Sequence, residues 1–205
     1  LPTENNVLKT FSIENEPVVE LVNNREREYI FADLPDIGYS TDIDTVMASS
    51  YQVKKQLQQI VKIEQPITNT LLYKRILRIW NLTRVTTRLQ VFIDSLLEDA
   101  YKDPLSGDTI IYWENKEKAK ECDFYRINSK RDILDIPILE VMSAARYAIE
   151  QQISMPIEDL KRLTSQLLGF SRKGNNLDMV TEQTIQLLIN KGIFSHANGM
   201  VSMNN

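Results

Sequence analysis

One short stretch of the chain gathers hydroxyl and guanidinium side chains, whose shared chemistry is phosphate binding. Threonine hydroxyls are small enough to let a phosphate approach closely, and two arginines four apart place positive charge and forked donors on one helix face. The residues are Thr83, Arg84, Thr86, Thr87 and Arg88. A second group, Ser171, Arg172 and Lys173 followed by Asn175 and Asn176, offers similar chemistry later in the chain. We expect nucleic-acid contacts at the first group, and at Arg172 and Lys173 in the second.

Residue types that carry catalysis are scarce. The only cysteine is Cys122 and the only histidine is His196, which makes a serine–histidine triad, a two-histidine metal site and an internal disulfide improbable. No glycine-rich loop of the P-loop pattern is present, so this chain by itself is not expected to be a P-loop ATPase. An acidic run from Asp94 to Asp108 could imitate a metal cluster, but exposed acids are the commoner explanation. We expect no cofactor, no metal and no enzymatic activity.

The charge is unevenly distributed. The 205 residues carry 24 basic and 28 acidic groups, a net charge of −4. Residues 52–92 nevertheless hold eight basic groups and a single acid, Glu64. An anionic partner would sense this basic window rather than the mean charge. The alternative is a solvated helix face whose charges pair with acids elsewhere in the chain.

Composition sets the general class. Hydrophobic residues make up 42% and charged residues 25%, the balance of a globular protein. No apolar run approaches the roughly 18 residues of a membrane span, and no signal-peptide pattern opens the chain. We therefore expect a cytoplasmic protein without a membrane partner.

Apolar spacing in the first half predicts three helices and a hairpin. Residues 1–45 are read as an irregular lead-in or linker, in which Pro17–Val22 and Tyr29–Leu34 could be strands. Helices are predicted over about Thr45–Ile63 and Thr68–Trp80, and a third after Thr83, a good N-cap residue. Thr109–Trp113 and Phe124–Ile127 are predicted to pair as a hairpin with a long polar tip.

The second half repeats this plan. Helices are predicted after Pro137, after Pro156 and around Leu177–Leu188. Asn198-Gly199 lies between two apolar runs, which is a strong hairpin signal because both residues tolerate positive φ. The two halves are offset by about 88 to 90 residues.

Three helices followed by a β-hairpin is the plan of a winged helix-turn-helix. The sequence thus predicts a mainly α protein with short β-hairpins, built as two tandem winged helix-turn-helix-like units. We place the first unit at 46–128 and the second at 129–205, after the lead-in at 1–45. In such a unit the third helix presents its first residues to the major groove.

Two segments also carry a family resemblance. Residues 60–67, from Ile60 to Ile67, and 82–89, from Leu82 to Leu89, resemble the C-terminal domain of unknown function in large bacterial superfamily 1 helicase-like proteins. Gln65 and Thr68 stand where that family has glycine and histidine, and Thr86 stands where glycine is common. Residues 168–174 match the family pattern better, and the resemblance covers about residues 50–195.

The resemblance implies that this chain is the tail of a multidomain protein, with an ATPase motor and in many members a nuclease-like domain upstream. Two hypotheses of different classes follow. The first is a non-catalytic module that binds or orients DNA for a helicase through the first winged-helix unit. The second is a protein-interaction module that docks on the helicase motor or on a partner.

Overall fold

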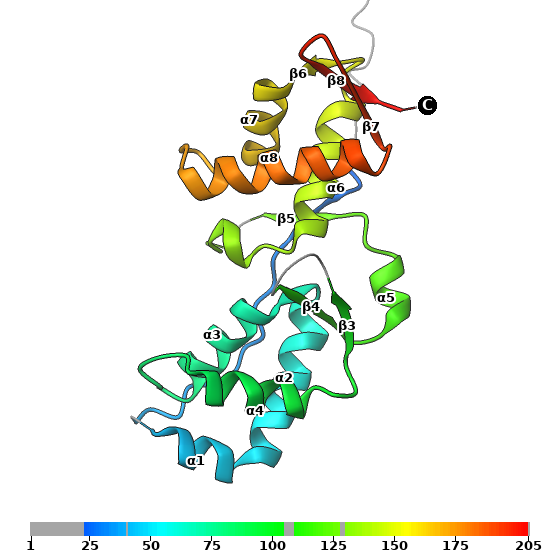
Figure 1. Cartoon of the computed structure of the whole chain (residues 1–205). Coiled ribbons are helices and arrows are strands. Elements are labelled where there is room, and N and C mark those ends of the chain that lie inside the picture. The colour runs from blue at the N-terminus through cyan, green and yellow to red at the C-terminus, as the bar shows by residue number, and fades with distance from the viewer. Residues whose placement is uncertain (1–22, 40, 105–108, 128–129, 205) are drawn as a thin grey trace, which may run out of the picture.

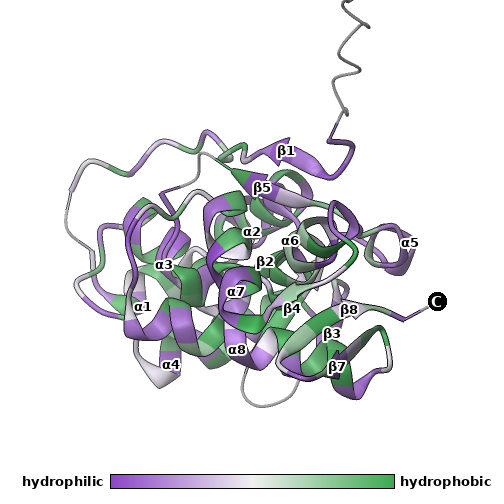
Figure 2. Ribbon diagram, turned by 90° about the horizontal axis from the view of Figure 1, so that it is seen from above, coloured by the Kyte–Doolittle hydropathy of each residue, from purple (hydrophilic) through white to green (hydrophobic). Residues whose placement is uncertain are grey.

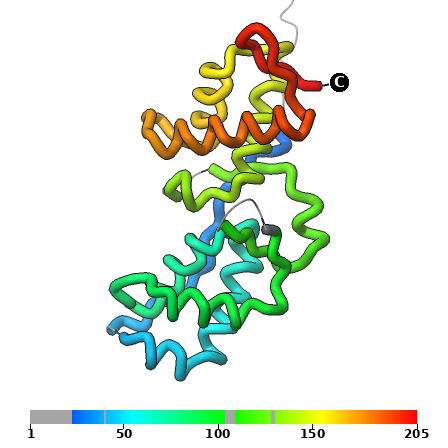
Figure 3. Tube along the Cα trace, in the orientation of Figure 1, coloured from blue at the N-terminus to red at the C-terminus, as the bar shows by residue number. Residues whose placement is uncertain are grey.

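The chain is folded into two lobes stacked on one another, as the cartoon and the Cα trace both show (Figures 1 and 3). The computed structural model describes residues 23–39, 41–104, 109–127 and 130–204. The predicted strand at Pro17–Val22 lies outside these residues. The described part is mainly helical, with eight α-helices and small sheets.

The first lobe holds four helices and one three-stranded antiparallel sheet. Its sheet has the order β2-β4-β3, so the short strand after the second helix pairs with the last strand of the hairpin. Its elements are α1 (Ile43–Ala48), α2 (Ser50–Glu64), β2 (Ile67–Thr68), α3 (Asn69–Ile79), α4 (Thr87–Leu96), β3 (Tyr101–Pro104) and β4 (Ile110–Trp113).

The second lobe follows the same order of elements. Its antiparallel sheet has the order β6-β8-β7, which corresponds strand for strand to the first. The lobe is entered through a 3-10 turn, η1 (Ile133–Asp135). Its elements are α6 (Ile138–Glu150), β6 (Met155–Pro156), α7 (Ile157–Leu167), α8 (Asn175–Asn190), β7 (Phe194–Ala197) and β8 (Met200–Met203).

The internal repeat is regular through its helices. α3 begins at residue 69 and α7 at residue 157, and both have 11 residues. α4 and α8 begin at residues 87 and 175, so both pairs are offset by 88. Even the break after the second helix is repeated, because Asn81 and Gly169 both adopt positive φ, 47° and 89°. Each helix therefore ends in a left-handed residue that reverses the chain toward the next.

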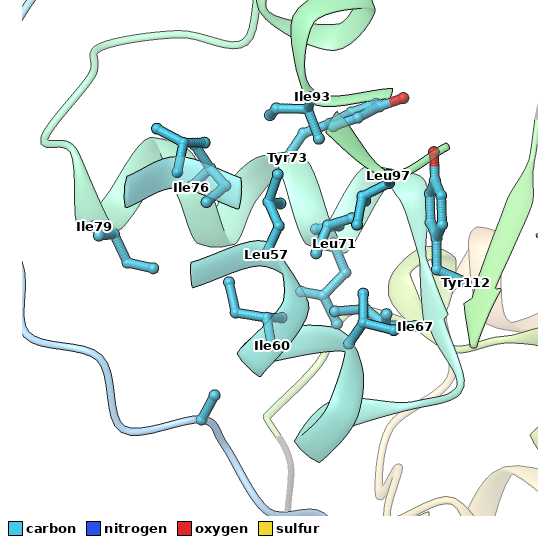
Figure 4. Packing of buried hydrophobic residues seen from close by; sticks show 14 of the residues in the cluster. Leu57, Ile60, Ile67, Leu71, Tyr73, Ile76, Ile79, Ile93, Leu97 and Tyr112 are labelled. Atoms are coloured by element: carbon cyan, nitrogen blue, oxygen red, sulfur yellow. The ribbon is translucent and has the colours of Figure 1, made fainter. Parts of the chain in front are cut away.

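The core of the first lobe confirms the predicted helical spacing. Figure 4 shows Leu57 and Ile60 of α2 facing Leu71 and Ile76 of α3, with Ile93 of α4 close by. The predicted helix over Thr45–Ile63 is divided, because a break at Ser49 separates α1 from α2. The second lobe has its own apolar cluster, which includes Ile149, Leu160, Ile185 and Val201. Its hairpin turns at Asn198-Gly199 with φ of 53° and 76°, as predicted.

The predicted hairpin of Thr109–Trp113 with Phe124–Ile127 is wrong. β4 pairs instead with β3, in the register Tyr101 to Trp113. The strand β5 (Tyr125–Ile127) pairs in parallel with β1 (Glu26–Glu28). The expected polar tip between them contains the short helix α5 (Lys116–Lys120). A parallel pair needs no tight turn, so the sequence around β5 carried no hairpin signal for its true partner.

The described part of the lead-in, from residue 23 onward, contacts both lobes. Tyr29–Leu34 forms no strand, yet Tyr29 and Ala32 are buried in the first core. Just upstream, β1 lies on β5, beside the helix α6 of the second lobe. In the view from above, β1 and the outer faces of α7 and α8 are strongly hydrophilic (Figure 2).

Candidate nucleic-acid interface

The turn between α3 and α4 sets the position of the predicted binding residues. After Trp80 ends α3, Asn81 turns the chain and the Leu82 amide donates to the Leu77 carbonyl at 2.9 Å. Thr86, not Thr83, caps α4: its hydroxyl accepts from the Leu89 amide at 3.2 Å. The prediction of Thr83 as the N-cap is therefore wrong by three residues, because a threonine in the turn and one at the helix start look alike in sequence.

Both arginines of the predicted surface are exposed. Arg88 lies in the first turn of α4, and its Nη2 is 2.7 Å from Oδ1 of Asp44 on α1. Arg84 lies in the preceding turn, is exposed, and has no ion pair recorded within the described residues. Thr83 and Thr87 are also exposed. The arrangement brings hydroxyl and guanidinium groups to the start of α4, as the sequence predicts.

The corresponding place in the second lobe has a different electrostatic character. Arg172 and Lys173 are exposed in the turn before α8. Beneath them Lys161 is buried, with its Nζ 2.7 Å from Asp178, 3.2 Å from Glu158 and 3.2 Å from Glu182. Burial by itself lowers the pKa of Lys161, but the three carboxylates outweigh it and raise that pKa above its ordinary value.

Two of these carboxylates, Glu158 and Asp178, also line a pocket of about 310 Å³ between α7 and α8. Acids on the outward side of α8 oppose an anionic partner. The second lobe is thus a poorer phosphate surface than the first.

Half of the basic window is paired with acids of the same chain. The pairs join Lys54 to Asp99, Lys74 to Asp135, Arg75 to Glu64 and Arg88 to Asp44. Of these, Arg75 is largely buried and unavailable to a partner. The exposed cations left by these pairs include Lys62, Arg78 and Arg84. The basic window therefore yields a smaller surface than its composition suggests.

A shallow apolar hollow lies beside the arginines. It has a volume of about 370 Å³ and lies between α1 and the outer face of α4, where Met47, Thr87, Arg88, Val91, Phe92 and Ser95 line it. Val91, one of the lining residues, is 65% exposed. This hollow can take an apolar side chain or a methyl group.

Buried ion pairs that sequence reasoning missed hold the lead-in and both lobes together. Glu64 accepts from the Tyr29 hydroxyl at 2.6 Å, the Ala32 amide at 3.0 Å and Arg75 Nε at 2.9 Å. In the sequence, the one sign of this buried role is that Glu64 is the single acid of the basic window. Burial is the largest effect on Tyr29, and with Glu64 it raises the pKa of the Tyr29 hydroxyl far above its ordinary value.

A second buried cluster lies at the seam between the lobes. Arg126 on β5 donates to the carbonyls of Glu64, Gln65 and Pro66 at 2.8, 3.2 and 2.6 Å. Its Nε also donates to Glu140 of α6 at 3.1 Å, and Arg131 Nη1 lies 2.8 Å from the same carboxylate. Burial by itself raises the pKa of Glu140, but the two guanidiniums outweigh it and hold that pKa below its ordinary value.

The remaining candidate residues take structural or exposed positions. Asp94 of the acidic run accepts from the Tyr73 and Tyr112 hydroxyls at 2.8 and 2.7 Å. Within the described ranges, no group of three or more histidine, cysteine, aspartate or glutamate side chains could hold a metal ion. Burial, with Glu140 nearby, raises the pKa of the Cys122 thiol to about 12, so this thiol is a poor nucleophile near neutral pH. His196 is exposed on β7.

None of the helices described is both long and apolar enough to cross a membrane. Comparison with curated proteins and with solved structures gave no match. Comparison with protein-family models gave one: residues 48–91, which contain α2, β2, α3 and the start of α4, match the family described as "Protein of unknown function (DUF3320)".

Proposed function

We propose that both lobes are winged-helix units and that the chain is a non-catalytic module that binds DNA through the first unit. The main supporting observation is that Arg84 and Arg88 are exposed together at the start of α4. Counted from α2, α4 is the third helix of a unit with sheet order β2-β4-β3. A third helix in this position enters the major groove with its first residues. Arginine forks suit both phosphates and guanine edges.

The ion pair of Arg88 with Asp44 is compatible with this role. Both side chains are more than half exposed, 57% and 74%. Exposed pairs of this kind contribute about 0–1 kcal/mol, so a phosphate can replace Asp44 at little cost. The exposed hydroxyls of Thr83 and Thr87 can approach the same phosphate backbone of DNA. The Thr86 hydroxyl is used in capping α4.

The module would act within a larger protein. The resemblance of residues 60–67 and 82–89 to the tails of helicase-like proteins supports a place beside a DNA motor. In that setting the upstream helicase domains are partners, and the first unit holds or orients the DNA that the motor moves. The turn of Arg172 and Lys173 would add at most a weaker contact, because acids lie on α8 beside it.

The test measures duplex DNA affinity by fluorescence anisotropy at low and moderate salt. Arg84→Ala with Arg88→Ala should weaken binding for all duplex sequences alike and make the slope of log affinity against log salt shallower by roughly one unit per lost contact. Stability should change by no more than about 0.5 kcal/mol at each surface site.

Lys116→Ala with Lys120→Ala on α5 is the matched control, since it removes the same charge from another exposed helix. Its affinity and salt slope should be nearly those of the wild type. Equal affinities and slopes for the Arg84 and Arg88 variant and the wild type would refute DNA binding at α4.

The second candidate is a protein-docking role for the same face. The hollow beside Val91 is the observation that favours it, because an exposed valine next to an apolar recess is typical of a partner surface. In that case duplex affinity is weak from the start and unchanged by the arginine substitutions, and Val91→Asp reduces binding of the upstream helicase domains.

A further inference from the structure

A second basic surface lies at the seam of the two lobes, away from α4. A pocket of about 510 Å³ opens there between α3 and residues 130–135. Its lining includes Phe31, Lys74, Arg78, Lys130, Asp132 and Asp135. None of the lining residues belongs to α4 or to the turn before it. The lining residues come from three parts of the chain: Phe31, the helix α3 of the first lobe, and residues 130–135.

The charges around this pocket leave a local positive surplus. Asp135 is buried and neutralised by Lys74, whose Nζ lies 2.8 Å from its carboxylate. Arg75 and Arg131, at the back of the pocket, are held by Glu64 and Glu140. Arg78 and Lys130 are exposed, and no ion pair is recorded for either within the described residues. Asp132 is the other acid among the lining residues, and its Oδ1 accepts a hydrogen bond from the Leu134 amide at 2.9 Å.

An aromatic ring stands at the same place. Phe31 is 46% exposed, whereas Tyr29, two residues before it, and Ala32, directly after it, are buried. The Tyr29 ring meets it edge-on with centroids 4.7 Å apart, and the Ala32 amide and carbonyl are tied to Glu64 and Arg75 at 3.0 and 2.6 Å. Buried polar contacts on both sides therefore hold the exposed ring in one position, which is the preorganisation a binding platform needs.

The ring also separates two pockets of different charge. Phe31 and Arg78 line a neighbouring recess of about 460 Å³, which is bordered by Asp33 and Asp36. The acids on that side repel phosphate, whereas Arg78 and Lys130 attract it on the other. An anionic ligand that uses the ring is therefore directed toward Lys130.

We propose that this pocket binds single-stranded nucleic acid, with one base stacked on Phe31 and the adjoining phosphates held by Arg78 and Lys130. Stacking on an aromatic ring next to cations is the usual means of holding unpaired strands. A duplex cannot use the ring, because its bases are stacked within the helix. The site is thus distinct from the proposed duplex contact at α4, and a module with both surfaces would meet DNA where a duplex opens.

The experiment uses the whole chain and three labelled ligands of about ten nucleotides: oligothymidylate, oligouridylate and an abasic strand. The variants are Phe31→Leu, Phe31→Tyr and Arg78→Gln with Lys130→Gln. Lys116→Gln with Lys120→Gln is the charge-matched control. Circular dichroism and thermal unfolding of each variant establish that it is folded, and Phe31→Tyr keeps the ring if Phe31→Leu proves unstable.

The site predicts a specific pattern. Phe31→Leu should weaken oligothymidylate binding at least about 5-fold and remove the preference over the abasic strand, and Phe31→Tyr should retain both. Arg78→Gln with Lys130→Gln should make the salt slope on single strands shallower by about 1.4. Oligouridylate should behave like oligothymidylate, because stacking does not read the 2′-hydroxyl.

Other results overturn the inference. They are a wild type that binds no oligothymidylate, a wild type that binds the abasic strand equally well, or pocket variants that bind like the control. Arg84→Ala with Arg88→Ala should leave single-strand affinity unchanged, and a parallel loss in that variant would assign the binding to α4 instead. Duplex affinity tests the α4 surface separately, so failure of either site is recognised on its own.

Discussion

At the scale of single residues, the buried glutamates carry the largest energetic consequences. Glu140 is fully buried between Arg126 and Arg131. Its charge compensates two guanidiniums that would otherwise be buried without a partner. Removing one member of such a group is strongly destabilising even where the group as a whole adds little to stability.

Glu140→Gln is therefore expected to lower the free energy of unfolding by about 3–5 kcal/mol at neutral pH. The sign of its pH dependence follows from its lowered pKa. The stabilisation is present above the unfolded pKa of about 4.3 and is lost as pH falls through the lower folded pKa. Urea unfolding at pH 7 and at successively lower pH should show the wild type losing more stability than the variant.

The control for this pair of measurements is Glu117→Gln on α5, whose side chain is exposed. It should reproduce the wild-type stability at neutral pH and its acid dependence. A Glu140→Gln protein with wild-type stability would contradict a buried charge at this position.

At the scale of elements, the start of α4 depends on Thr86 rather than on Thr83. The Thr86 hydroxyl accepts from the Leu89 amide, which satisfies one of the helix donors that has no intrahelical partner. Thr86→Ala should lower the free energy of unfolding by about 1 kcal/mol. Thr83→Ala, at an exposed site in the turn, should change it by less than about 0.5 kcal/mol.

Thermal or urea unfolding of the two threonine variants checks this difference. Because the substitutions are chemically identical, the comparison isolates the cap. Equal losses in both variants, or a larger loss at Thr83, would place the helix start where the sequence first suggests it.

At the scale of the whole molecule, Arg126 joins the two lobes. Its guanidinium reaches three carbonyls at the end of α2 and also Glu140 of α6. Two further contacts join the lobes at the same seam. Lys74 forms an ion pair with Asp135, and the Thr68 hydroxyl donates to the Asp135 carbonyl at 3.2 Å. Directional polar contacts therefore join the lobes, whereas each apolar cluster lies within one of them.

Arg126→Lys keeps the charge but cannot reproduce the planar fork. Hydrogen exchange should become faster for the amides of Gln65, Ile67 and Thr68 and of residues 125–127, while α8 retains its protection. Arg146→Lys, which alters a partly exposed arginine on α6, is the control and should leave the seam unchanged. Unaltered exchange at the seam in Arg126→Lys would mean that packing alone holds the lobes together.

The sequence by itself determined the helices, the break at Asn81 and the hairpin at Asn198-Gly199. These depend on apolar periodicity and on residues that tolerate positive φ, which are local properties that neighbouring residues reveal. The repeat offset of 88 is readable for the same reason. The exposure of Arg84 and Arg88 also follows locally, because they lie off the apolar stripe of α4.

Only the tertiary structure decided the partner of each strand and of each charge. β5 pairs with β1, a segment about 100 residues away, and Lys74 meets Asp135 across 61 residues. Strand pairing and ion pairing depend on which distant segments come together, and residue type alone does not encode that choice. The pocket around Phe31 could not be predicted from the sequence for the same reason, because its ring and its cations belong to three separate parts of the chain.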